Sequence, residues 1–87
     1  MFSREVDELK PLICGLAARG GHLEVLQLAR ELGCPWDVYT SSGAAAGGHL
    51  EVLKWARGQD CPWDEDTCTY AALGGHLVVL RWAREHG

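Results

Sequence analysis

Histidine and cysteine are the residue types in this chain best suited to metal or redox chemistry, and both recur at a fixed interval. His22, His49 and His76 each follow a Gly-Gly pair, and they lie 27 residues apart. Bonds from zinc to a histidine nitrogen are about 2.0–2.1 Å long, whereas stacked helical layers are about 8–10 Å apart. Three histidines that are each one repeat apart therefore cannot share a metal, and the spacing favours a structural role.

The four cysteines follow the same interval. Cys34 and Cys61 begin two Cys-Pro-Trp-Asp segments, while Cys14 and Cys68 are equivalent to each other and to Ser41. Equivalent cysteines one layer apart exceed the Cα separation of about 7 Å that a disulfide allows.

Cys61 and Cys68 stay a candidate disulfide or half of a zinc site, because the loop could fold back on the first helix of its own unit. Their spacing fits no two-by-two zinc motif. We therefore expect small buried thiols in a reducing compartment, with no bound metal or cofactor.

These segments belong to a repeat that covers nearly the whole chain. Units 7–33, 34–60 and 61–87 align without insertions after a leader, 1–6. A fixed period of 20–50 residues indicates a stacked array in which one unit alone cannot bury its apolar face. We therefore expect a single repeat domain over 1–87, as part of a longer array.

The middle unit predicts two short helices. Proline at position 35 keeps helix from starting at Cys34, and Asp37 or Thr40 can cap the first helix. That helix ends at the glycine pair 47–48, where glycine accepts the left-handed conformation. The second helix runs from about His49 to about Arg57, so each unit is a helix–turn–helix.

One segment of each unit resembles the helix pair of ankyrin repeats. The pattern is Ala-Ala-x-Gly-Gly-His-Leu-x-Val-Leu over 17–26, 44–53 and 71–80. An ankyrin repeat has about 33 residues, and the six that are missing here fall where ankyrins carry a β-hairpin finger. The chain is similar to short ankyrin-like repeats of the Cys-Pro-Trp type in large protist, algal and giant-virus proteins.

The resemblance implies an all-α solenoid of three stacked helix pairs without the finger. It also implies that each histidine opens a second helix and bonds locally. Binding of a protein partner would use the first helices and the inter-repeat loops.

Composition excludes several function classes. The net charge of −4 argues against nucleic-acid binding, because such proteins need a basic field. No apolar run reaches the roughly 18–20 residues of a membrane span, and no secretory leader is seen. No nucleophile–base or paired-carboxylate spacing suggests an enzyme. We expect an intracellular protein, in the cytoplasm or the nucleus.

Positions that differ between units are free to serve a partner, whereas identical ones serve the stack. The differing sets of equivalents are Pro11/Val38/Glu65, Leu12/Tyr39/Asp66, Gly15/Ser42/Thr69, Leu16/Gly43/Tyr70 and Arg19/Ala46/Leu73. The partner-binding residues predicted from them are Arg19, Val38, Tyr39, Ser42, Glu65, Asp66, Thr69, Tyr70 and Leu73. The alternative is that these positions vary without a function because they lie on a solvent-exposed face. The acidic run 64–66 likewise either begins a helix or meets a basic partner.

The tryptophans occupy two repeated positions, 36/63 and 55/82, which are leucines in the first unit. Packing in the core or between units is the expected role. An exposed tryptophan would instead be a candidate binding anchor.

The last unit carries Val78 where Glu24 and Glu51 stand. Its added apolar surface suggests either that the array continues or that this unit associates with a second molecule. The sequence as a whole predicts a protein-interaction module. A structural spacer of a longer array and a cysteine-based metal or redox switch are the alternatives.

Overall fold

The computed structural model describes the backbone of residues 4–86 and the side chains of residues 12–86. All regular structure in these residues is α-helical, which confirms the predicted all-α class. The helices are α1 (Arg4–Arg19), α2 (Leu23–Glu31), α3 (Val38–Gly47), α4 (Leu50–Gly58), α5 (Glu65–Leu73) and α6 (Leu77–His86).

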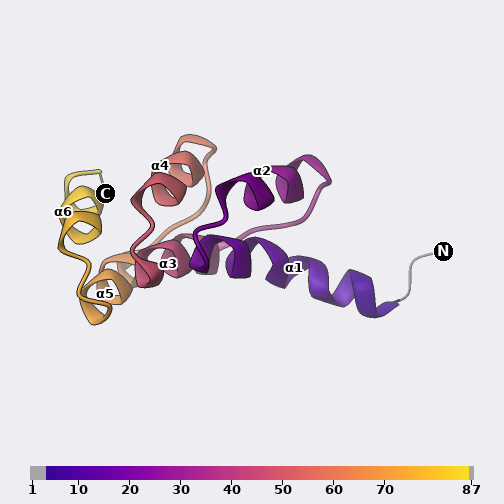
Figure 1. The fold of residues 1–87 in the computed structure, drawn as a ribbon, viewed down its shortest axis with the longest axis horizontal. Coiled ribbons are helices and arrows are strands. Elements are labelled where there is room, and N and C mark those ends of the chain that lie inside the picture. Colours follow the sequence, from indigo (N-terminus) through magenta and orange to yellow (C-terminus); the bar gives the residue numbers. More distant parts are fainter. Residues whose placement is uncertain (1–3, 87) are drawn as a thin grey trace.

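The six helices form two rows (Figure 1). In one row α1, α3 and α5 pack side by side, and each also packs against the helix that follows it in the chain. The second helices, α2, α4 and α6, stand apart from one another in the other row. The first helices therefore make the continuous layer of the molecule.

Side-chain caps begin the later first helices. The backbone N–H of Tyr39 donates to the Asp37 carboxylate at 2.9 Å. In the next unit the backbone N–H of Asp66 donates to the Asp64 carboxylate at 3.0 Å. Asp37 is thus the cap of α3, whereas the other candidate, Thr40, is buried. At its far end α3 stops at Gly48, which has a φ of +75°.

The first unit departs from the other two. The residues Asp-Glu-Leu-Lys at 7–10 replace Cys-Pro-Trp-Asp, and α1 is continuous from Arg4 to Arg19 although it contains Pro11. Its start lies within the segment 1–6 that was expected to be a leader.

Small residues let the first helices approach closely. Ala18, Ala45 and Ala71 are fully buried. A Cβ on Gly43 would lie 3.2 Å from the Gly15 carbonyl oxygen, which is tighter than ordinary van der Waals contact. Close packing of helices requires such side chains.

Each later histidine joins two units. His76 precedes α6, and its Nε2 lies 3.0 Å from the carbonyl oxygen of Ala46, which accepts from the tautomer protonated at Nε2. The expectation of a local bond is therefore wrong for His76. The helix-opening role is seen at His49, the N-cap residue of α4, although its side chain makes no capping bond. The His49 ring instead lies against Gly21 of the preceding unit, which has no side chain to occupy that space.

The tryptophans pack between the second helices, as predicted. Trp36 meets Trp55 edge-on with ring centroids 5.7 Å apart, while the guanidinium of Arg30 lies 4.2 Å above the Trp36 ring. The same Arg30 donates to the Cys34 carbonyl at 2.7 Å. Trp36, in the loop before α3, thus connects α2 with α4. Trp63 makes the equivalent contacts between α4 and α6.

Candidate functional site

The cysteines are placed as packing residues. All four thiols are free; Cys14, Cys34 and Cys61 are buried, and Cys68 is partly exposed. Cys61 Sγ lies 3.4 Å from Ser41 Oγ and 3.6 Å from the Asp37 carbonyl oxygen, both in the preceding unit. The loop therefore packs against the unit before it. This corrects the idea that it folds back to bring Cys61 onto the first helix of its own unit.

The environment of two thiols disfavours ionisation. Burial, the largest cause, raises the pKa of Cys14 and of Cys61 above the ordinary value of 9.0. Because the thiolate is the form that attacks disulfides and binds metals, these two cysteines are poorly suited to redox or metal chemistry. Among the described residues, no group of three or more His, Cys, Asp or Glu side chains is arranged to hold a metal ion.

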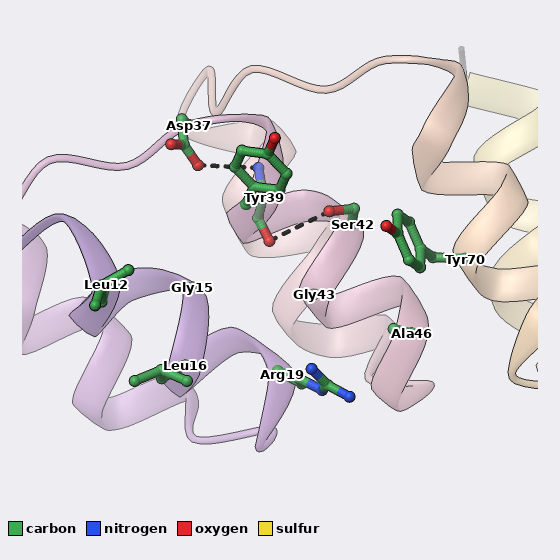
Figure 2. Close-up of a pocket in the computed structure, with 10 residues that line it drawn as sticks. All are labelled: Leu12, Gly15, Leu16, Arg19, Asp37, Tyr39, Ser42, Gly43, Ala46 and Tyr70. Atoms are coloured by element: carbon green, nitrogen blue, oxygen red, sulfur yellow. Dashed lines mark hydrogen bonds between the residues drawn. The ribbon is translucent and has the colours of Figure 1, made fainter.

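A groove on the first-helix row is one of several concave surfaces, and the depressions beside Trp36 and Trp63 are somewhat larger, at about 580 and 520 Å³. The groove spans α1, α3 and α5 and encloses about 460 Å³, which is within the usual range of ligand sites. The residues that line it are Leu12, Gly15, Leu16, Arg19, Asp37, Tyr39, Ser42, Gly43, Ala46 and Tyr70 (Figure 2). We call it the α3 groove.

Along α3 the α3 groove is lined by small residues. Ser42, Gly43 and Ala46 carry short side chains or none, and the Ser42 hydroxyl donates to the Tyr39 carbonyl at 3.4 Å. The bulkier Leu16 on α1 and Tyr70 on α5 lie to either side (Figure 2). The groove is therefore shallow over α3 and bounded by larger, mainly apolar groups.

The bounding side chains are widely open to solvent. Leu16 is 66% exposed, Tyr39 68% and Tyr70 41%. Arg19, at the last turn of α1, points along the groove toward Ala46 (Figure 2). Leucine, tyrosine and arginine side chains are thus exposed close together in the α3 groove.

The structure gathers four of the nine predicted binding residues in this groove: Arg19, Tyr39, Ser42 and Tyr70. Leu73 is on α5 one turn beyond Tyr70 and is exposed, but it lies outside the lining.

The other four predicted residues also lie outside the groove. Val38 is half-buried at the start of α3, and Glu65 lines a separate depression beside Trp63. The backbone N–H of Asp66 serves the α5 cap, and the Thr69 hydroxyl donates to the Glu65 carbonyl at 3.4 Å. The Thr69 bond is local to α5 and explains this residue without a partner, whereas the Asp66 carboxylate is exposed at the start of α5.

Six lining residues were absent from the predicted set: Leu12, Gly15, Leu16, Asp37, Gly43 and Ala46. The signal for most of them was available, since Leu12 is equivalent to Tyr39 and Leu16 to Tyr70. Taking each variable position in all three units would have found them.

Comparison of the chain with models of protein families, with curated proteins and with solved structures returned no significant match. None of the described helices combines the length and the hydropathy that crossing a bilayer requires.

Proposed function

We propose that this chain is a protein-interaction module, an ankyrin-like solenoid without fingers that binds a protein partner through the α3 groove. The observation that carries the proposal is a division between positions. The alanines at 17, 44 and 71, identical in all units, are buried, whereas the variable Leu16 and Tyr70 are exposed and line one groove. Ser42 is a variable lining residue that is buried, and Leu77 in the last unit is an identical residue that is exposed. Drift on a solvated face gives no reason for variable positions to be apolar and adjacent.

The residue types support binding more than a spacer role. Tyrosine and arginine are enriched among residues that contribute most to binding, and Tyr39, Tyr70 and Arg19 line this groove. Exposing Leu12 and Leu16 to water has a cost that a partner would remove. No catalytic role is part of the proposal.

A selection experiment tests the proposal without a known partner. A phage-displayed random peptide library is selected against the folded chain, and selected peptides are titrated calorimetrically against wild type and the Leu16→Ala and Tyr70→Ala variants. Each substitution should weaken binding by about tenfold, as expected for truncating an anchor residue.

The matched control is Leu32→Ala, which truncates an exposed leucine at the end of α2, away from the groove. It should leave affinity unchanged. If no peptide is enriched, or if groove variants bind as wild type does, the chain is better explained as a spacer.

A second binding mode is favoured by one observation on the last unit. Val78 is 64% exposed and lies beside Leu77, which is also exposed, although the equivalents Glu24 and Glu51 are charged. We propose that this edge lets two copies associate. Light scattering over a concentration series should show a dimer that Val78→Glu removes, and a monomer at every concentration would refute it.

A further inference from the structure

The α3 groove has the shape and charge to take one kind of partner. We infer that it binds an amphipathic α-helix of about three turns, which lies over α3 and antiparallel to it. The inference rests on the proposed function and goes further by specifying the partner's conformation, its direction and the placement of its charges.

The shape of the groove fits a helix. Neighbouring helices pack about 8–10 Å apart, so α1 and α5 stand on either side of α3 with Leu16 and Tyr70 raised above it. Gly43 and Ala46 allow a partner backbone to approach α3 closely. α3 is 10 residues long, and at about 1.5 Å per residue a matching partner helix is about 15 Å, or three turns.

The backbone requirements of the partner also favour a helix. An extended peptide gains affinity by pairing its N–H and C=O groups with an open strand edge. The lining of this groove comes from helices and a capped turn, and its Ser42 hydroxyl already donates to the Tyr39 carbonyl oxygen. A partner buried here must satisfy its own backbone groups, which a helix does.

Charge and helix dipole together set the direction. Figure 2 shows α1 and α3 running the same way, with Arg19 beside the end of α3 and Asp37 beside its start. Asp66 lies in the first turn of α5, at the same end as Asp37. The groove is therefore basic where α3 ends and acidic where α3 begins.

A helix is stabilised by acidic residues in its first turn and by basic residues in its last turn. Laid antiparallel to α3, such a partner places its first-turn carboxylates at Arg19 and its last-turn cations at Asp37 and Asp66. Its own dipole then opposes that of α3. The charge pairs at both ends and the opposed dipoles of the two helices favour this direction, and both become unfavourable if the partner is reversed. The partner's own terminal dipole charges, about half an elementary charge each, are repelled by Arg19 and Asp37, but they are smaller than the full charges of its first-turn and last-turn side chains.

The apolar stripe of the partner follows from the lining. Side chains spaced i, i+4 and i+7 lie on one helix face, and that face would meet Leu12 and Leu16 on one side and Tyr70 on the other. The predicted partner is thus a segment with acidic residues first, an apolar stripe across about three turns, and Lys or Arg last.

The test uses a designed peptide of about 14 residues with leucines at i, i+4 and i+7, Glu in the first turn and Lys in the last. A nitroxide is attached to one end or the other, and relaxation of the ¹⁵N-labelled protein is recorded. With the label at the peptide N-terminus, amides near Arg19 and Ala46 should broaden. With the label at its C-terminus, broadening should move to Tyr39 and Asp66.

Two controls test whether the bound peptide is helical and whether the charges at the two ends of the groove contribute to binding. A proline in the middle of the peptide should abolish binding if the bound form is helical. The double variant Arg19→Glu, Asp66→Lys should weaken binding of the designed peptide about threefold to tenfold, whereas Arg81→Glu, an exposed charge reversal on α6, should change it less.

The outcomes distinguish this inference from the proposed function. Broadening in the reverse order would overturn the antiparallel arrangement. Equal binding of the proline peptide in the same groove would overturn the helix while leaving the interaction module intact. If the designed peptide fails to bind although library peptides bind at the groove, the helix inference is wrong, and if neither binds there, both proposals fail.

Discussion

The imidazole of His76 packs directly against Gly48 of the preceding unit. A Cβ on Gly48 would come within 2.5 Å of His76 Nδ1, and His49 stands in the same relation to Gly21 at 2.6 Å. Gly48 also has a φ of +75°, which favours glycine. One residue thus ends a helix and leaves room for the next unit, so the repeated Gly-Gly-His is an inter-unit contact.

Substitution of the glycines separates these two roles. Gly75 has a φ of +73° but no atom within 4 Å of a Cβ, so Gly75→Ala should cost only the left-handed conformation, about 1–2 kcal/mol. Gly48→Ala adds the clash with His76 and should cost at least about 1 kcal/mol more. Urea unfolding measures both, and equal losses would contradict the inter-unit role.

Arg57→Lys should destabilise the chain by about 1 kcal/mol, because lysine loses the planar stacking that arginine makes. The Arg57 guanidinium lies 4.1 Å above the Trp63 ring, and its Nη1 donates to the Cys61 carbonyl at 3.1 Å. The matched control is Arg84→Lys, the equivalent and exposed position in unit three, which should stay within about 0.5 kcal/mol of wild type. Comparable effects in thermal unfolding would show that stacking on Trp63 contributes little.

The buried thiols predict loss of stability at high pH. Because burial raises the pKa of Cys14 above 9.0, the unfolded chain releases this proton at a lower pH than the folded chain does. The free energy of unfolding therefore falls as the pH rises past about 9. Cys14→Ser removes one such group, and it is the residue already found at position 41, where Ser41 donates to the Pro62 carbonyl at 2.9 Å.

Urea unfolding of wild type and Cys14→Ser, compared from about pH 7 to about pH 10, checks this. The variant should fold and should lose less stability over this range. An unchanged pH dependence would mean that Cys14 does not titrate differently in the two states.

Truncating groove residues should leave the fold intact. Tyr39→Ala removes an exposed side chain and should change the free energy of unfolding by no more than about 0.5 kcal/mol. Leu53→Ala empties a fully buried site and should cost about 2–5 kcal/mol. Denaturant unfolding compares the two, and a large loss for Tyr39→Ala would assign the groove to the core.

Local chemistry made much of the fold predictable. Asp37 as a cap, Gly48 as a helix end and Trp36 as a packing residue all follow from the properties of the residue type at that place. These are short-range effects, and sequence carries them directly.

What sequence could not supply was which unit each loop meets. A 27-residue period is the same whether Cys61 packs on its own first helix or on the preceding one. The contact with Ser41 depends on the offset between neighbouring units. The α3 groove has the same origin, since Leu16 and Tyr70 are far apart in the chain and lie on either side of α3 only after stacking.

The central claim is that the α3 groove is the working surface of this protein. Amide chemical-shift changes, measured on the ¹⁵N-labelled chain with the tightest peptide from the library selection, test it most directly. The account predicts changes concentrated in α1, α3 and α5 around Leu16, Gly43 and Tyr70. Changes confined to α2, α4 and α6 would contradict it.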